Sequence, residues 1–194
     1  MMSTPTLLDL IGVYEGVLDT NICEKLITLA DKIKKPCQSE QSDADGYFEQ
    51  INPHDYAAFK TYLSRIYNTL LQAREIHFNV KLPERVSFST TLTSFRIERY
   101  SLNGSNRVSH PVGPTSNATA SRLFVMLAYL NDVEKGGETV FDHLDAGIKP
   151  KAGTVVIFPY MQMYRYSDMK PISNAAKYVL STYVRFSYPR VMAA

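Results

Sequence analysis

The apolar run RLFVMLAYLN, residues 122–131, is the feature that most constrains the fold of this chain. From Leu123 to Leu130 the run has apolar side chains at odd and even positions alike. Successive side chains of a β-strand point to opposite faces, so a strand of this composition has to be covered on both sides. The run therefore predicts a strand that is buried on both faces.

Two amphipathic helices precede this run. Asn21 and Glu24 have the spacing of a capping box, and apolar residues follow at helical intervals until Pro36 ends the pattern. A second helix is predicted from about Asp55 to Arg74, with one apolar stripe along it. Each stripe needs a sheet or the other helix to cover it.

Short strands dominate after residue 83. Besides the opening run, the predicted strand segments are SFSTTLTSFRIERY (87–100), GTVVIFPY (153–160) and KYVLSTYVRFSY (177–188), with a turn at Asn103-Gly104. Two helices followed by many strands predict an α+β, mainly β fold, in which the helices cover one face of a sandwich or open barrel. At 194 residues, one domain is the default.

Composition excludes several classes of protein. The net charge of +2 and the scattered Lys and Arg residues do not form a nucleic-acid surface. Two cysteines, Cys23 and Cys37, make neither a zinc site nor a disulfide framework. Such low cysteine usage favours the reducing interior of a cell as the location of the protein. The sequence shows no membrane-spanning run and no signal peptide, so we expect a soluble, unsecreted protein with a polar surface loop at 38–46.

Several motifs follow one another in a recognisable order in the C-terminal half. They are RY (99–100), Gly104, His110, Arg122, YLNDVEKGGETVF (129–141), IKPKAGTVVIFP (148–159) and KPISNAAKYVLSTYVRF (170–186). This order, over roughly residues 95–187, resembles the 2-oxoglutarate and iron(II)-dependent oxygenases of the prolyl 4-hydroxylase type, including short phage-encoded versions. The resemblance implies a double-stranded β-helix, or jelly roll, with N-terminal supporting helices. We expect a single domain, 1–194, with helical support and first strands in 1–82 and the β-helix core in 83–190.

The resemblance also implies an iron site made of a His-x-Asp pair and a later, distal histidine. His110 is at the position of the first histidine, but Val112 is at the position of the carboxylate and has no donor atom. Counting back from Lys177 places Ser167 at the distal position, or Tyr166 if the loop is shifted by one residue. No histidine follows His143, so that strand cannot supply one.

Other ways to hold a metal remain open. In related halogenases a halide replaces the carboxylate, although Val112 fills that space with apolar atoms. Asp168 could join His110 in an unusual metal-binding pair if its loop turned inward. His143 and Asp145 also form a His-x-Asp, which we interpret as a surface loop, whereas polar or capping roles are expected for His54 and His77.

The resemblance assigns the 2-oxoglutarate pocket to Tyr129 and Lys177, with Arg185 as a further candidate. The alternatives are a core aromatic for Tyr129, an ion pair or an exposed stem for Lys177, and a similar ambiguity for Arg185. The segment YMQMYRY (160–166) is rich in residues that plug cavities or form contact surfaces, and we favour plugging.

The sequence thus leads to two hypotheses from different classes. The first is an oxygenase fold that has lost its iron ligands and acts as a binding or structural module. Such a module would have a protein partner or self-assemble, for example in a phage virion, and would need no cofactor. The alternative is an active iron(II) and 2-oxoglutarate dioxygenase that hydroxylates a peptidyl side chain at a non-standard metal site. A sugar- or nucleotide-binding jelly roll is a third interpretation without a motif of its own.

Overall fold

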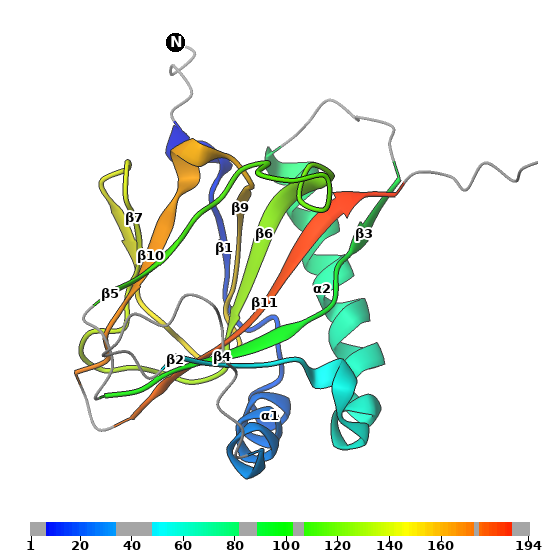
Figure 1. Ribbon diagram of the computed structural model, residues 1–194, viewed down its shortest axis with the longest axis vertical. Coiled ribbons are helices and arrows are strands. Elements are labelled where there is room, and N and C mark those ends of the chain that lie inside the picture. The colour runs from blue at the N-terminus through cyan, green and yellow to red at the C-terminus, as the bar shows by residue number, and fades with distance from the viewer. Residues whose placement is uncertain (1–6, 34–47, 82–88, 103–106, 173–174, 188–194) are drawn as a thin grey trace, which may run out of the picture.

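A computed structural model describes residues 7–33, 48–81, 89–102, 107–172 and 175–187 (Figure 1). The polar segment 38–46 and the Asn103-Gly104 turn lie outside the described residues. The described strands form two antiparallel sheets. In Figure 1 the small sheet lies to the left of the large one, and α2 (Lys60–Lys81) lies on the other side.

The large sheet has seven strands and the small sheet four. In spatial order the large sheet contains β1 (Gly12–Tyr14), β9 (Val155–Pro159), β6 (Arg122–Tyr129), β11 (Lys177–Phe186), β4 (Arg96–Tyr100) and β2 (Phe48–Ile51), and β3 (Thr90–Leu92) also pairs with β11. The order in the small sheet is β5 (Arg107–His110), β10 (Tyr166–Met169), β7 (Thr139–Phe141) and β8 (Ala146–Ile148). Strands distant in sequence are thus neighbours, as in a jelly roll.

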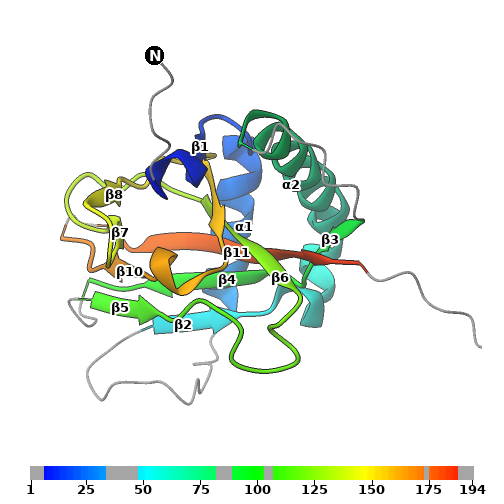
Figure 2. The ribbon, with the colours of Figure 1, turned by 90° about the horizontal axis from the view of Figure 1, so that it is seen from above.

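The two predicted helices are present, with corrected ends. The first, α1 (Thr20–Lys32), is capped by Asp19, whose side chain accepts a hydrogen bond from the Asn21 amide, so Asn21 is not the capping residue. The second, α2, begins later and ends later than predicted, because two 3₁₀ turns, Pro53–Asp55 and Ala57–Phe59, occupy the expected start. Both helices lie together on one side of the large sheet (Figure 2). No helix in the described residues is both long and apolar enough to cross a membrane.

Alternation along the central strands divides the buried side chains into two clusters. In β6, Phe124, Met126 and Ala128 belong to the cluster under the helices, whereas Val125 and Leu127 belong to the cluster between the sheets. The prediction that residues 122–131 are buried on both faces is therefore confirmed: helices cover one face and the small sheet covers the other.

A turn at residues 135–138 requires its glycines. Gly136 and Gly137 both have positive φ, 71° and 75°, a region that side chains with a Cβ adopt at a cost. A Cβ at Gly136 would also lie 2.4 Å from the carbonyl oxygen of Lys170. The turn therefore lets β7 enter the small sheet alongside the segment that follows β10.

Candidate functional site

Six polar side chains converge between the two sheets from five strands. They are Glu98 and Tyr100 of β4, His110 of β5, Thr139 of β7, Asp168 of β10 and Lys177 of β11. All are buried except His110, whose side chain is 18% exposed. Buried charges are stable only when they are paired and hydrogen-bonded, so the contacts within this group decide what it can do.

The register of β10 determines which of its side chains enter the group. Tyr166 is paired with His110, and Ser167 with Ser109. Because residues two apart share a face, Tyr166 and Asp168 point inward while Ser167 points away. The Ser167 hydroxyl lies 3.0 Å from that of Ser109 and donates to Asp142 at 2.8 Å. Ser167, the predicted distal position, therefore does not face His110, and β10 presents Tyr166 and Asp168 to it instead.

Asp168 forms an ion pair with Lys177 in the interior. The side chains of Asp168 and Lys177 are 1% and 0% exposed. Thr139 donates to the same carboxylate oxygen, Oδ1, at 2.6 Å. Burial raises the pKa of Asp168, but the Lys177 charge and the His110 hydrogen bond outweigh it and hold the pKa well below its usual range. Asp168 is therefore an anion whose charge is balanced by the chain itself.

The Tyr100 hydroxyl lies at the centre of the group. It is 2.9 Å from Asp168 Oδ2, 3.0 Å from His110 Nε2 and 3.1 Å from Glu98 Oε2. A hydroxyl has one proton, so it donates to one carboxylate at a time. Glu98 also accepts a hydrogen bond from Ser181 at 2.8 Å. The phenol thus links the only histidine of the group to both of its carboxylates.

Burial of His110 opposes its protonation, whereas its neighbours favour it. Burial lowers the pKa of His110, but the hydrogen bond to Asp168 and the charges of Asp168 and Glu98 raise it above the ordinary value. The His110 Nε2 atom lies 3.0 Å from Asp168 Oδ2, and the imidazolium form donates a proton at this position.

Aromatic rings fill the space beside His110. The Tyr166 ring stacks on the imidazole, with centroids 4.7 Å apart and planes inclined by 13°. In the 160–166 segment Tyr160, Tyr164 and Tyr166 are buried in the cluster between the sheets, as plugging predicts, while Met161 and Met163 are exposed. Val112 is 3% exposed and joins the same cluster.

The structure brings together two of the three predicted 2-oxoglutarate residues. The Lys177 ammonium lies 5.3 Å from the centroid of the Tyr129 ring, and Tyr129 is completely buried. Arg185 is exposed near the far end of β11, where it is paired with Arg122 and Thr91. Its location does not support a role beside Lys177.

The remaining histidines lie away from this group. His143 is exposed in the turn after β7, as expected. His54 accepts a hydrogen bond from the Phe95 amide at 3.3 Å, a polar role of the kind predicted. The expectation that His77 follows a helix end is wrong, because α2 continues to Lys81 and buries it completely. Its Nδ1 atom lies 2.9 Å from the Tyr14 hydroxyl.

Glu98, His110 and Asp168 are also the only group of three described residues that brings metal-ligand atoms together, within 4.8 Å of one another. As folded, this donor set does not fit an iron site. The Tyr100 hydroxyl lies 2.9–3.1 Å from Glu98 Oε2, His110 Nε2 and Asp168 Oδ2, so these three atoms already share the phenol as a hydrogen-bond partner. Asp168 is in addition neutralised by Lys177. An ion would have to displace the phenol and compete with an ammonium.

Glu98, Tyr100 and Thr139 escaped the sequence analysis. The RY motif drew attention to Tyr100 only as part of a resemblance. Alternation places Glu98 and Tyr100 together on the face opposite Ile97, but the sequence carries no sign that this face is buried. For Thr139 the sequence carries no comparable signal.

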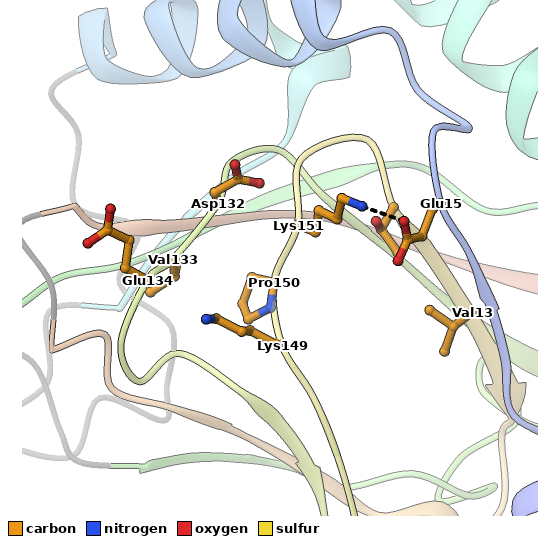
Figure 3. Close-up of a pocket in the computed structure, with 9 residues that line it drawn as sticks. Val13, Glu15, Asp132, Val133, Glu134, Lys149, Pro150 and Lys151 are labelled. Carbon is orange, nitrogen blue, oxygen red and sulfur yellow. Dashed lines mark hydrogen bonds and ion pairs between the residues drawn. The ribbon is translucent and has the colours of Figure 1, made fainter.

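A separate hollow of about 440 Å³ lies outside this group (Figure 3). It is lined by Val13, Glu15, Asp132, Val133, Glu134, Lys149, Pro150, Lys151 and Thr154. Lys151 and Glu15 form an ion pair across it, and Asp132 accepts a hydrogen bond from the Ala152 amide at 2.7 Å. These charges are exposed, in contrast to those between the sheets.

Comparison with solved structures identifies this architecture. A truncated form of the viral collagen prolyl hydroxylase of Paramecium bursaria Chlorella virus-1 matches 97% of this chain and 96% of its own, with a TM-score of 0.65 and 20% identity. A Trichoplax adhaerens prolyl hydroxylase, in complex with a hypoxia-inducible factor peptide fragment, matches 91% and 84%, with a TM-score of 0.63 and 15% identity. A Pseudomonas putida prolyl-4-hydroxylase matches 92% of this chain and 93% of its own, with a TM-score of 0.57 and 14% identity.

The fold is therefore the double-stranded β-helix of the prolyl 4-hydroxylases, as the sequence motifs implied. No protein-family profile matches the sequence, and no curated protein sequence matches it significantly.

Proposed function

We propose that this chain is a prolyl-hydroxylase-like module that binds partners or builds an assembly without iron(II) and 2-oxoglutarate chemistry. The observation that carries the proposal is the position of the Tyr100 hydroxyl among Glu98, His110 and Asp168. A fold keeps its stability from its core when its site changes, so a filled site is compatible with a stable scaffold.

The test is an anaerobic titration of the protein with iron(II) and 2-oxoglutarate, followed by the visible charge-transfer absorption that a chelated complex gives. We expect no band in the wild-type protein at millimolar iron. Tyr100→Phe serves as a matched variant, because it removes the hydroxyl and keeps the ring. If the hydroxyl is what excludes the ion, this variant should bind metal more tightly than the wild type.

The alternative is an active dioxygenase that acts on a peptidyl side chain, and the three converging donors favour it. A band at micromolar iron in the wild-type protein, together with consumption of 2-oxoglutarate, would establish this alternative and remove our proposal. His110→Ala should then abolish both signals, whereas under our proposal it changes neither.

The module needs a partner, and we propose another protein or further copies of this chain, as in a phage virion. The resemblance to short phage-encoded versions supports this setting. Light scattering across a concentration series tests self-assembly directly. A particle mass that stays at 21.9 kDa at all concentrations excludes self-assembly and leaves a different protein as the partner.

A further inference from the structure

The anion that neutralises Lys177 is supplied by the chain. The Lys177 ammonium bonds to Asp168 and Thr139 and lies 5.4 Å from the centroid of the Tyr100 ring. We propose that Asp168 is a built-in substitute for a small free carboxylate at Lys177. Folding would then fill the site that the sequence resemblance assigns to 2-oxoglutarate. The inference rests on the proposed function and explains how the module dispenses with this co-substrate.

The Asp168 carboxylate sits in a complete cradle. Its Oδ1 atom is bound by Lys177 and by Thr139 at 2.6 Å, and its Oδ2 atom lies 2.9 Å from the Tyr100 hydroxyl and 3.0 Å from His110 Nε2. Both oxygens are therefore engaged by groups that can donate hydrogen bonds. This is the arrangement that a carboxylate ligand requires, because each of its oxygens accepts more than one hydrogen bond.

None of the four residues around the Asp168 carboxylate belongs to β10, the strand that carries Asp168. Tyr100, His110, Thr139 and Lys177 come from β4, β5, β7 and β11. Truncating the Asp168 side chain would therefore remove the anion and leave the donors in their strands. Lys177 would keep the nearby charges of Glu98 and Glu138 but would lose the carboxylate bonded to it. A buried ammonium that loses its bonded partner is strongly destabilising, which favours uptake of a carboxylate small enough to enter.

The size of that carboxylate follows from the truncation. Asp168→Ala removes one carboxylate group and keeps the Cβ atom, so formate matches the space that is vacated. The larger 2-oxoglutarate should not fit in the same space. Asp168→Ala/Lys177→Met is the control variant, because it has the vacated space without the ammonium.

The experiment is urea unfolding of the wild type, Asp168→Ala and the double variant, in sodium chloride and in sodium formate of equal ionic strength, with EDTA throughout. For a site with a Kd of about 10 mM, 100 mM formate raises the folding equilibrium constant of Asp168→Ala about tenfold. The wild type and the double variant should change less than about twofold, because only Asp168→Ala has an ammonium that has lost its bonded carboxylate.

Equal effects of formate on Asp168→Ala and the wild type would overturn the proposal, as would an equal effect on the double variant. If Asp168→Ala is unfolded in chloride, circular dichroism during formate titration replaces urea, and a chain that stays unfolded in molar formate also overturns it. EDTA keeps this result independent of metal binding, which the iron titration tests separately.

Discussion

At the scale of single residues, the chemistry of the space between the two sheets depends on which side chains fill it. Asp168 was considered from the sequence only as a metal ligand beside His110, and the structure gives it a second partner, Lys177. Strand alternation predicts that Glu98 faces away from Ile97, but not that this second face is buried. The position of the Tyr100 hydroxyl could not be predicted, because it depends on how three strands from different parts of the chain come together.

Tyr100→Phe should cost more stability than an ordinary buried hydroxyl. The Tyr100 hydroxyl contacts two carboxylates, and hydrogen bonds to charged groups contribute about 1.5–3 kcal/mol, against about 0.5–1.5 kcal/mol for neutral pairs. Tyr67→Phe is the control, since the Tyr67 hydroxyl bonds to the neutral Thr91 hydroxyl at 3.0 Å. Urea unfolding of both variants measures the difference, and equal losses would contradict a charged network.

At the scale of elements, the two sheets and two helices follow from periodicity, whereas their ends do not. The apolar stripe predicted a helix as far as Arg74, but α2 continues to Lys81 and buries His77 against β1. A histidine in an apolar helix face can be buried without charge, and periodicity alone gives no sign of this. Helix ends are set by local capping and by tertiary contacts of this kind.

His77 should make the protein less stable in mild acid. Burial, followed by the charge of Lys81, lowers the pKa of His77 to about 4 in the folded chain, against about 6.5 when unfolded. The unfolded state therefore binds more protons between these values, and stability is lost as the pH falls from about 6.5 to about 4. His77→Asn, which keeps an acceptor for Tyr14, should reduce this loss by about 2–3 kcal/mol in urea unfolding at both pH values. An unchanged pH dependence would show that His77 is not responsible.

The 135–138 turn should tolerate no side chain at its first glycine. Gly136→Ala combines positive φ with a Cβ placed 2.4 Å from the Lys170 carbonyl oxygen, so we expect a loss of at least about 2 kcal/mol. At Gly147 a Cβ would meet only Val140 at an ordinary 3.7 Å, and Gly147→Ala should change stability by less than about 1 kcal/mol. Thermal unfolding of the two variants tests this, and a similar melting temperature for both would disprove it.

At the scale of the whole molecule, the N-terminal segment is part of the fold rather than an addition to it. Strands β1 and β2 belong to the large sheet, and the helices cover its outer face. The sequence predicted this support, because two helical stripes and a strand buried on both faces need one another. It gave no order for the strands, since pairing between distant segments leaves little trace in local patterns.

A chain limited to residues 83–190 should therefore fail to fold. It would lack β1 and β2 and would expose apolar residues of the outer face, among them Met126, Ile157 and Leu180. We expect the fragment to aggregate or to lack a cooperative thermal transition, while the full chain unfolds cooperatively. A soluble fragment with a sharp transition would show that the β-helix is stable without its helices.

The segment between β9 and β10, residues 160–165, affects the site through its length, because its length helps to set the register of β10. Inward and outward positions alternate along the strand, so the number of residues between Pro159 and Tyr166 sets Asp168 toward Lys177 and Ser167 toward Asp142 on the opposite face. Inserting one residue there, with β10 shifted by one position against its neighbours, would bring Ser167 to the position of Asp168. Lys177 would then face a hydroxyl instead of a carboxylate, with no position in the cradle mutated. The length of one loop thus specifies the chemistry between the two sheets as firmly as the identity of any residue there.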